Sequence, residues 1–265
     1  MRALARAPVR VAYALYATLA FLALGLTALL ATLILPGLHR RRAAARAVSR
    51  AFLWVAGMPL TVRGTERLAA GQCIVVSNHA SYLDGLVFTA ALPARFGFVI
   101  KREMSGVPLA GLFLRRIGSE FVERFDRNRV AADARRVLRN AASGHSLVFF
   151  PEGTFTRTPG LLKFHTGAFV TAARAGCPVI PAVVRGTRAA LPPTGALPRP
   201  GRIVVDILPA VDAEPQAGEA SSVALRDRAR QAILLALGEP DLTCSGDSAL
   251  PPHTAPARSA RASRS

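Results

Sequence analysis

Residues 73–84 read CIVVSNHASYLD, an apolar run followed by a polar turn and the start of a second apolar stretch. A short apolar run bounded by turn residues predicts a buried strand, here Cys73–Ser77. The apolar stretch that follows predicts a helix over Leu83–Ala91. In α/β sheets, ligand sites gather where strands end and turns begin. The turn between this strand and this helix therefore holds the first candidate functional residues, His79 and Asp84.

Strands and helices are predicted to alternate along most of the chain. Short runs of apolar and β-branched residues predict strands over Leu60–Arg63, Cys73–Ser77, Phe96–Ile100, Ser119–Val122, Ser146–Phe150, Val179–Val184 and Ile203–Leu208. Helices are predicted over Ala43–Gly57, Leu83–Ala91, Leu109–Ile117, Arg129–Ala142, Gly167–Ala175 and Ser221–Leu237. This alternation favours one α/β domain over residues 51–240, with a sheet that is covered by helices on both faces.

The composition limits the classes of protein that need to be considered. Of the 265 residues, 51% are hydrophobic, which excludes an intrinsically disordered protein. The three cysteines have no metal-ligand spacing and are too few for a disulfide framework, which fits a reducing compartment. With 34 Lys and Arg against 16 Asp and Glu, the net charge is +18. Because such a charge is also typical of nucleic-acid binding, its position along the chain matters.

The positive charge is densest around an uncharged segment near the N-terminus. Residues 1–50 contain eight arginines and no acid, and these arginines flank the apolar run Val11–Leu38. As a helix, its 28 residues would be about 42 Å long, and a bilayer core requires only about 20 residues. A cleaved signal peptide is the alternative, although its apolar region is usually about 7–15 residues long. We expect residues 1–50 to be embedded in a membrane, and Gly25 and Pro36 leave open a straight helix or a bent or re-entrant helix pair.

The flanking arginines favour one orientation of this segment. Five follow the apolar run and three precede it, so the positive-inside bias places the main domain in the cytoplasm. We expect these arginines to be solvated and also to contact anionic lipid headgroups. Nucleic acid is not an expected partner, because the sequence has few aromatic residues and no helix-turn-helix, zinc or RNP pattern. Residues 241–265 are rich in Ser, Ala, Pro and Arg and predict a disordered basic tail.

His79 and Asp84 have the residue types and the spacing for acid–base chemistry. A regular helix would set them about 140° apart around its axis, so they meet only if His79 lies in the turn and Asp84 in the first helical turn. The carboxylate would then fix the imidazole tautomer and leave the other ring nitrogen as a general base. No serine or cysteine elbow supplies a nucleophile, so the base would act on a substrate hydroxyl. The alternative is a structural histidine followed by an aspartate that caps the helix.

Three further segments carry polar residues next to predicted strands. Residues 149–157 read FFPEGTFTR. They predict a turn whose backbone amides can approach an anion and whose Arg157 can bind phosphate. The alternative is an ordinary turn with Glu152 in solvent. Residues 118–124 read GSEFVER, which is also typical of an edge strand with a charged end. Residues 179–183 read VIPAV, and the proline favours an edge strand or a bulge near a pocket.

Together these four segments resemble the motifs of the glycerolipid acyltransferase family. Residues 78–84 are similar to the family's first motif, NHxxxxD, and residues 118–124 to its second, a glycine and a short strand that ends in arginine. Residues 150–154 are similar to the third motif, FPEGT, and residues 179–183 to the fourth, a strand that contains a proline. The order and spacing agree, and the resemblance spans residues 55–210. Four motifs in order are much more specific than any one of them, and NHxxxxD and FPEGT contribute most.

The resemblance implies a fold, a reaction and roles for individual residues. The fold would be a single glycerol-3-phosphate acyltransferase-like domain with a mixed sheet, on the cytoplasmic face of the cell membrane. The reaction would transfer an acyl group from acyl-CoA or acyl-carrier protein to 1-acyl-sn-glycerol-3-phosphate, giving phosphatidic acid, with no bound cofactor or metal. His79 would act as the base and Asp84 as its partner. The residues implied to hold the acceptor are Arg124, Glu152, Gly153, Thr154 and Arg157.

Two departures from the family pattern leave the acceptor open. Many members have arginine directly after FPEGT, where this chain has Phe155, and a shorter Asp is frequent where this chain has Glu123. Another lysolipid, such as the amino-acid-containing lyso-ornithine lipid, is therefore an alternative acceptor. From a different class, the alternative is a membrane-anchored basic protein that binds anionic lipid or nucleic acid without catalysis.

Overall fold

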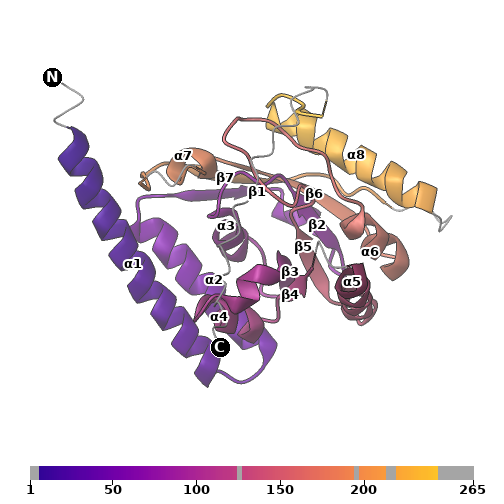
Figure 1. The fold of residues 1–265 in the computed structure, drawn as a ribbon, viewed down its shortest axis with the longest axis horizontal. Coiled ribbons are helices and arrows are strands. Elements are labelled where there is room, and N and C mark those ends of the chain that lie inside the picture. The colour runs from indigo at the N-terminus through magenta and orange to yellow at the C-terminus, as the bar shows by residue number, and fades with distance from the viewer. Residues whose placement is uncertain (1–5, 124–126, 194–196, 213–218, 244–265) are drawn as a thin grey trace, which may run out of the picture.

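The computed structural model describes residues 6–123, 127–193, 197–212 and 219–243 (Figure 1). Within these residues the strands form one sheet in the order β1-β7-β6-β2-β5-β3-β4. The strands are β1 (Leu60–Arg63), β2 (Ile74–Ser77), β3 (Phe96–Lys101), β4 (Glu120–Val122), β5 (Ser146–Phe149), β6 (Val179–Arg185) and β7 (Ile203–Ile207). Every neighbouring pair is parallel except β6 with β7, so the sheet is mixed as expected.

Helices cover both faces of this sheet. The helices are α1 (Arg6–Ile34), α2 (Leu38–Val55), α3 (Asp84–Ala91), α4 (Ala110–Arg116), α5 (Arg127–Ala142), α6 (Gly167–Ala175), α7 (Thr187–Ala190) and α8 (Glu219–Leu237), with 3₁₀ turns η1 (Thr65–Arg67) and η2 (Arg102–Gly106). One apolar cluster joins α2 and α3 to the sheet, and a second joins α5, α6 and α8 to the opposite face. The expected α/β class and two-sided cover are confirmed.

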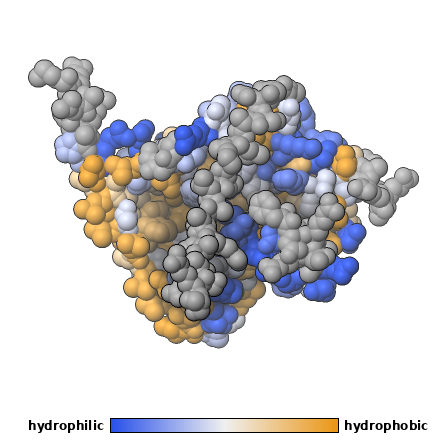
Figure 2. All heavy atoms as spheres, in the orientation of Figure 1, coloured by the Kyte–Doolittle hydropathy of each residue, from blue (hydrophilic) through white to orange (hydrophobic). Residues whose placement is uncertain are grey.

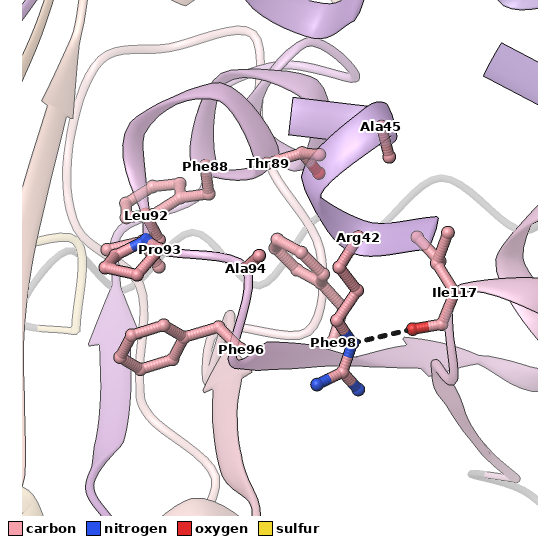
Figure 3. A pocket seen from close by; sticks show the side chains of 10 residues that line it. All are labelled: Arg42, Ala45, Phe88, Thr89, Leu92, Pro93, Ala94, Phe96, Phe98 and Ile117. Carbon is pink, nitrogen blue, oxygen red and sulfur yellow. Dashed lines mark hydrogen bonds between the residues drawn. The ribbon is translucent and has the colours of Figure 1, made fainter. Parts of the chain in front are cut away.

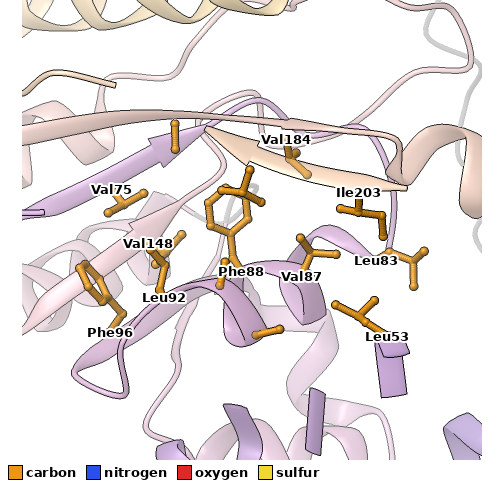
Figure 4. Close-up of a cluster of buried hydrophobic side chains, with 14 of the residues drawn as sticks. Leu53, Val75, Leu83, Val87, Phe88, Leu92, Phe96, Val148, Val184 and Ile203 are labelled. Carbon is orange, nitrogen blue, oxygen red and sulfur yellow. The ribbon is translucent and has the colours of Figure 1, made fainter. Parts of the chain in front are cut away.

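Side chains that alternate along the central strands build the two clusters. Val75 of β2 and Val148 of β5 point to the α2–α3 side, where they pack around Phe88 (Figure 4). Their neighbours Ile74 and Val76 belong to the cluster on the other side. Since the central strands are buried on both faces, their sequences are continuous apolar runs, which is the pattern that predicted them.

The strand that contains the proline, β6, was expected to be an edge strand or to have a bulge. It lies between β7 and β2 and is buried along most of its length, so the expected edge position is wrong. The expected bulge is present. Between the pairs Val179–Val211 and Ala182–Ile207, two residues of β6 face the three residues 208–210. Pro181 therefore sits where the ladder with β7 is interrupted, and its missing N–H removes no regular pairing there.

The apolar run near the N-terminus lies almost entirely in one helix, which a second helix follows. α1 ends at Ile34, and α2 begins at Leu38 after Gly37, whose φ of 77° is a left-handed value that glycine adopts without strain. The Tyr13 hydroxyl, near the start of α1, donates to the carbonyl of Ala56 at the end of α2, at 2.7 Å. The two helices are thus antiparallel neighbours (Figure 1). Since α1 continues unbroken through Gly25 and is long and apolar enough to cross a membrane, both a straight span and a re-entrant arrangement stay predictions.

Several arginines of this region bind the domain itself. Arg42 is buried in a pocket between α2, α3 and β3 (Figure 3) and donates to the carbonyls of Arg95, Ile117 and Gly118 at 2.8, 2.9 and 3.2 Å. Arg50 donates to a carbonyl near the end of α3 at 3.2 Å. For Arg42 the expected solvent or headgroup contacts are wrong, because the side chain is buried and backbone carbonyls of the fold bind it, whereas Arg50 remains exposed. The expected boundary between residues 50 and 51 falls inside α2.

The chain after α8 returns to the domain. The Leu161 amide donates to the carbonyl of Pro240 at 2.9 Å, and the Leu242 amide donates to the carbonyl of Leu161 at 3.1 Å. Asp241 accepts two hydrogen bonds from the guanidinium of Arg230, at 2.6 and 2.9 Å. The tail expected over residues 241–265 therefore begins with residues that are part of the fold, and residues 244–265 lie outside the described residues.

Candidate active site

The candidate site forms where β2 and β5 end. The two strands are parallel neighbours, so the turns that follow them lie at the same edge of the sheet. The turn after β2 contains His79, and the turn after β5 contains Glu152. The strand ladder thus brings together two segments that are about seventy positions apart in the sequence.

His79 lies in the turn and Asp84 in the first turn of α3, which is the arrangement in which their spacing allows them to meet. Nδ1 of His79 lies 2.8 Å from Oδ2 of Asp84. The same carboxylate oxygen accepts the backbone N–H of Ala80 at 2.6 Å and of Ser81 at 2.9 Å. Asp84 is the first residue of α3, but its side chain binds N–H groups upstream and none of the helix, so it is not a helix cap.

This contact selects one tautomer of the imidazole. An ionised carboxylate only accepts hydrogen bonds, so Nδ1 of His79 carries the hydrogen and Nε2 carries the lone pair. The Asp84 side chain is fully buried, whereas the His79 side chain is 19% exposed. The ring is therefore held firmly on one side and remains accessible enough to accept a proton from a bound molecule.

Glu152 holds the two turns together. Its Oε1 accepts the backbone N–H of His79 at 2.6 Å, and its Oε2 accepts the N–H of Leu162 at 2.8 Å. The residue is only 4% exposed, and burial raises the pKa of its carboxyl to about 7, although these two N–H donors and Arg188 oppose the shift. The alternative of a solvated Glu152 is wrong. Both of its oxygens bind the backbone, and its contact with an acceptor stays a prediction.

Asn78 connects the first motif to the strand that contains the proline. Its side-chain amide donates to the carbonyl of Val184 at 3.0 Å and accepts the N–H of Val184 at 2.9 Å. The amide thereby extends the pairing of β2 with β6 by one residue. The fourth segment, 179–183, thus belongs to the strand that supports the histidine turn.

Aromatic rings enclose the imidazole of His79. Phe150 stacks on it with ring centroids 4.6 Å apart, and Phe155 meets it edge-on, also at 4.6 Å. Tyr82, which is 70% exposed, packs against Phe155 at 4.8 Å. Sequence reasoning did not assign these rings to the site. The available signal was the grouping of Phe149, Phe150 and Phe155 in a chain with only 6% aromatic residues.

The loop after Glu152 carries the remaining predicted binding residues. Gly153 has a φ of 72°, and its amide donates to the carbonyl of Phe150 at 3.0 Å, which forms the tight turn. Thr154 and Arg157 are exposed on the same loop. The structure therefore places Gly153, Thr154 and Arg157 on the segment that directly follows the site, and their binding roles stay predictions.

Arg124 lies outside the described residues, but the chain that leads to it is well anchored. The N–H of Glu123 donates to Oδ2 of Asp133 at 2.9 Å. Asp133, which is buried on α5, also binds the guanidinium of Arg102 through both carboxylate oxygens. Asp133 belongs to no motif, so sequence reasoning had no signal for it.

Comparison with known proteins places the same segments in a family. Residues 59–185 match the family model described as Acyltransferase, and this range includes the His79–Asp84 turn, Glu152 and all of β6. This segment is thus similar to acyltransferase domains. The resemblance inferred from the four motifs is thereby confirmed.

Individual relatives agree with this assignment. The chain is 33% identical over 134 residues to a chloroplastic 1-acyl-sn-glycerol-3-phosphate acyltransferase of Brassica napus, covering 49% of this chain and 38% of that protein. It is 39% identical over 119 residues to a lysophospholipid acyltransferase of Arabidopsis thaliana, covering 42% and 28%. The chain thus spans less than half the length of these two relatives.

The acyltransferase domain also resembles a solved structure. The crystal structure of the 1-acyl-sn-glycerophosphate acyltransferase PlsC from Thermotoga maritima matches with a TM-score of 0.72, over 88% of this chain and 97% of that one. At 19% sequence identity, this match shows that the two proteins share a fold.

Proposed function

We propose that the chain is an O-acyltransferase that acylates the free hydroxyl of 1-acyl-sn-glycerol-3-phosphate, giving phosphatidic acid in phospholipid biosynthesis. The observation that carries the proposal is the 2.8 Å contact between Nδ1 of His79 and Asp84, at the end of a central strand. The relatives named 1-acyl-sn-glycerol-3-phosphate acyltransferase support the choice of acceptor. Acyl-CoA or acyl-carrier protein is the donor, and the thioester is the only co-substrate.

In the proposed first step, Nε2 of His79 removes the proton from the acceptor hydroxyl. Asp84 stabilises the imidazolium that forms, because its carboxylate already accepts the hydrogen on Nδ1. The alkoxide oxygen then forms a bond to the thioester carbonyl carbon, giving a tetrahedral oxyanion. When this intermediate collapses, the carbon–sulfur bond breaks, and the proton on Nε2 passes to the departing thiolate.

The oxyanion needs hydrogen-bond donors that are not already in use. The amide of His79 donates to Glu152, and those of Ala80 and Ser81 donate to Asp84. These three amides therefore hold the catalytic pair in place rather than the oxyanion. A backbone amide of the loop after Gly153 or a substrate-induced change in the turn would have to supply the donors.

The acceptor phosphate would be bound by the arginines at this end of the sheet. Arg157 is exposed on the loop that follows Glu152. Arg124 comes two positions after the end of β4 in the sequence, outside the described residues. A guanidinium binds phosphate through charge-assisted, often bidentate hydrogen bonds. Gly153 and Thr154 would contribute backbone and hydroxyl contacts to the glycerol.

The helix pair would place the site at a lipid surface. Over Pro8–Ile34, α1 is long and apolar enough to cross a membrane. Its exposed leucines include Leu15, Leu19, Leu22 and Leu26, which fall on one helix face by their spacing. Figure 2 shows this apolar surface along α1. Within the proposal, this face lies in the cytoplasmic leaflet of the cell membrane, near anionic lipids, and the domain faces the cytoplasm.

A donor and acceptor panel tests the proposed function. The full chain in detergent is given radiolabelled acyl-CoA or acyl-carrier protein together with 1-acyl-sn-glycerol-3-phosphate, lysophosphatidylethanolamine or lyso-ornithine lipid. We expect labelled phosphatidic acid with at least one donor. Transfer to none of the acceptors would contradict the proposal and favour a non-catalytic basic membrane protein.

One observation favours a second acceptor class. Phe155 occupies the position after FPEGT and packs on His79 and Tyr82. The surface beside the imidazole is therefore apolar at the position where many glycerolipid acyltransferases have an arginine. An acceptor with a less anionic headgroup, such as lyso-ornithine lipid, fits such a wall. Faster transfer to that lipid than to 1-acyl-sn-glycerol-3-phosphate would establish this alternative.

A further inference from the structure

We propose that Arg188, which belongs to none of the four motifs, is a positioning residue that presents Arg157 to the acceptor phosphate. The inference rests on the proposed function, because it assumes that the loop after Glu152 receives a phosphate-bearing acceptor. Arg188 lies on α7, directly after β6, and its side chain is 17% exposed.

Arg188 binds the loop on both sides of Arg157. Its Nη1 donates to the carbonyl of Thr156 at 2.8 Å and to the carbonyl of Thr158 at 2.9 Å. The hydroxyl of Thr156 also donates to the carbonyl of Thr158 at 2.8 Å. The two residues that flank Arg157 are therefore fixed by one guanidinium, while Arg157 itself is exposed.

A carboxylate on a third segment fixes Arg188 in turn. Oε2 of Glu239, just after α8, accepts a hydrogen bond from Nη2 of Arg188 at 3.1 Å. The same oxygen accepts the N–H of Gly160, the residue that closes the loop, at 2.6 Å. Arg188 and Glu239 thus connect the loop to two separate helices.

The far end of the loop packs closely against the chain that follows α8. Gly160 has a φ of 145°, and a Cβ on it would lie 2.5 Å from Leu242. The next residue, Leu161, pairs with the chain around Pro240 and Leu242. At the near end, Glu152 accepts the N–H of Leu162, so both ends of the loop are tied to each other as well.

This arrangement gives the guanidinium of Arg157 a fixed starting point. Phosphate binding then requires ordering of one side chain and not of the backbone, which lowers the entropy lost on binding. The need is specific to this chain, because Phe155 packs on His79 and Arg157 is the arginine nearest to FPEGT. A rigid loop allows an arginine two positions further along to serve the phosphate.

A double-mutant cycle on Arg157 and Arg188 tests the inference. With the lysophosphatidate acceptor, Arg157→Gln, Arg188→Gln and the double variant are compared in acceptor KM and in kcat, and the dissociation constant of sn-glycerol 3-phosphate is measured separately. We expect each single substitution to raise the acceptor KM and the dissociation constant about 10-fold, the effect of losing one charge-assisted contact, with kcat nearly unchanged. The double variant should be no worse than Arg157→Gln, because Arg188 acts through Arg157.

Two further variants keep the result interpretable. Arg174→Gln removes an exposed arginine of α6, away from the loop, and should leave all three quantities unchanged. Glu239→Gln loosens Arg188 while leaving it in place, so it should raise the acceptor KM by a smaller factor, and only when Arg157 is present.

Several outcomes would overturn the inference. Multiplying effects in the double variant, or a loss of kcat with an unchanged acceptor KM, would show that Arg188 does not act through Arg157. A KM for the lysophosphatidate acceptor that does not change in Arg157→Gln would also overturn it and leave acyl transfer standing. Absence of both turnover and glycerol 3-phosphate binding in the wild type would end the inference together with the proposed function.

Discussion

Two buried carboxylates, Asp84 and Glu152, support His79 in different ways. Asp84 binds the ring at Nδ1 and two amides of the turn, so it sets the orientation of the imidazole. Glu152 binds the backbone N–H of His79, so it sets where the turn lies. The FPEGT glutamate therefore acts on the base through the backbone, which its motif alone does not reveal.

The raised pKa of Glu152 leads to a pH-dependent stability. Burial raises this pKa from 4.5 to about 7, so the folded state binds the proton more tightly than the unfolded chain. The stabilisation from this group is fully present below about pH 4.5 and is lost as the pH rises through about 7. The difference, 7 − 4.5 = 2.5 units, corresponds to about 3 kcal/mol at most. Glu152→Gln removes the titration.

Chemical denaturation of wild type and Glu152→Gln measures this effect. The free energy of unfolding of the wild type, relative to the variant, should decrease between about pH 5 and pH 8, by up to about 3 kcal/mol. Glu66→Gln, at an exposed position on η1, serves as the control and should show a much smaller change. A wild-type advantage that stays constant or increases with pH would contradict the buried, protonatable Glu152.

At the scale of elements, α2 is held to the sheet by a buried cation. Arg42 donates to one carbonyl directly before β3 and to two carbonyls between α4 and β4. Its guanidinium also lies close to Gly97 and Gly118, where a Cβ would contact it. Arg42→Met keeps most of the apolar stem but leaves those carbonyls without their donor. We expect the free energy of unfolding to fall by roughly 2–4 kcal/mol.

The matched control for this prediction is two residues away. Arg40 is exposed on the same helix, so Arg40→Met should change the free energy of unfolding by less than about 0.5 kcal/mol. Thermal or urea unfolding in detergent gives both values. Equal effects of the two substitutions would show that Arg42 does not anchor α2.

Most strands were predictable, because their signal is local. Each predicted strand agrees with the observed one to within one residue at either end, since short apolar runs between turn residues are typical of buried strands. The His79–Asp84 contact was predictable for the same reason, as the turn and the helix start are both local. The start of α2 was missed because its arginines were interpreted as the flank of a membrane segment, whereas distant carbonyls bind Arg42.

Long-range contacts account for the other differences. Pro181 favoured an edge strand, but the bulge that accommodates it is formed by residues 208–210, far along the chain. Arg188 and Glu239 have no local pattern that relates them to the FPEGT loop. Phe155 was noted as a departure from the family pattern, but its packing on His79 depends on how two turns meet in space.

At the scale of the whole molecule, the charge of +18 has several separate uses. Some arginines of α2 bind backbone carbonyls, Arg188 and Arg230 fix the chain around the FPEGT loop, and Arg157 remains exposed near the site. The apolar face of α1 is formed by uncharged side chains, so membrane association through this face does not depend on the net charge. The net charge therefore does not by itself identify a partner.

Exposed leucines of α1 provide a test of membrane association. Leu22→Glu with Leu26→Glu changes side chains that are 59% and 53% exposed, so the fold should be kept. We expect the fraction that floats with phosphatidylglycerol-containing vesicles to fall at least about 10-fold, because burying glutamate in a bilayer is unfavourable. The control Leu235→Glu, at a 74% exposed position on α8, should float like the wild type. Unchanged flotation of the double variant would contradict insertion of α1.

The central claim is that His79, held by Asp84, removes the proton from a lysolipid hydroxyl. The most direct measurement is the single-turnover rate of acyl transfer to 1-acyl-sn-glycerol-3-phosphate for wild type, His79→Ala and Asp84→Asn, with flotation and thermal unfolding to confirm intact protein. We predict that His79→Ala lowers the rate by at least about 100-fold and that the affinity for the acceptor changes little, because loss of a general base affects the chemical step. A folded His79→Ala variant with a near wild-type rate would contradict the claim.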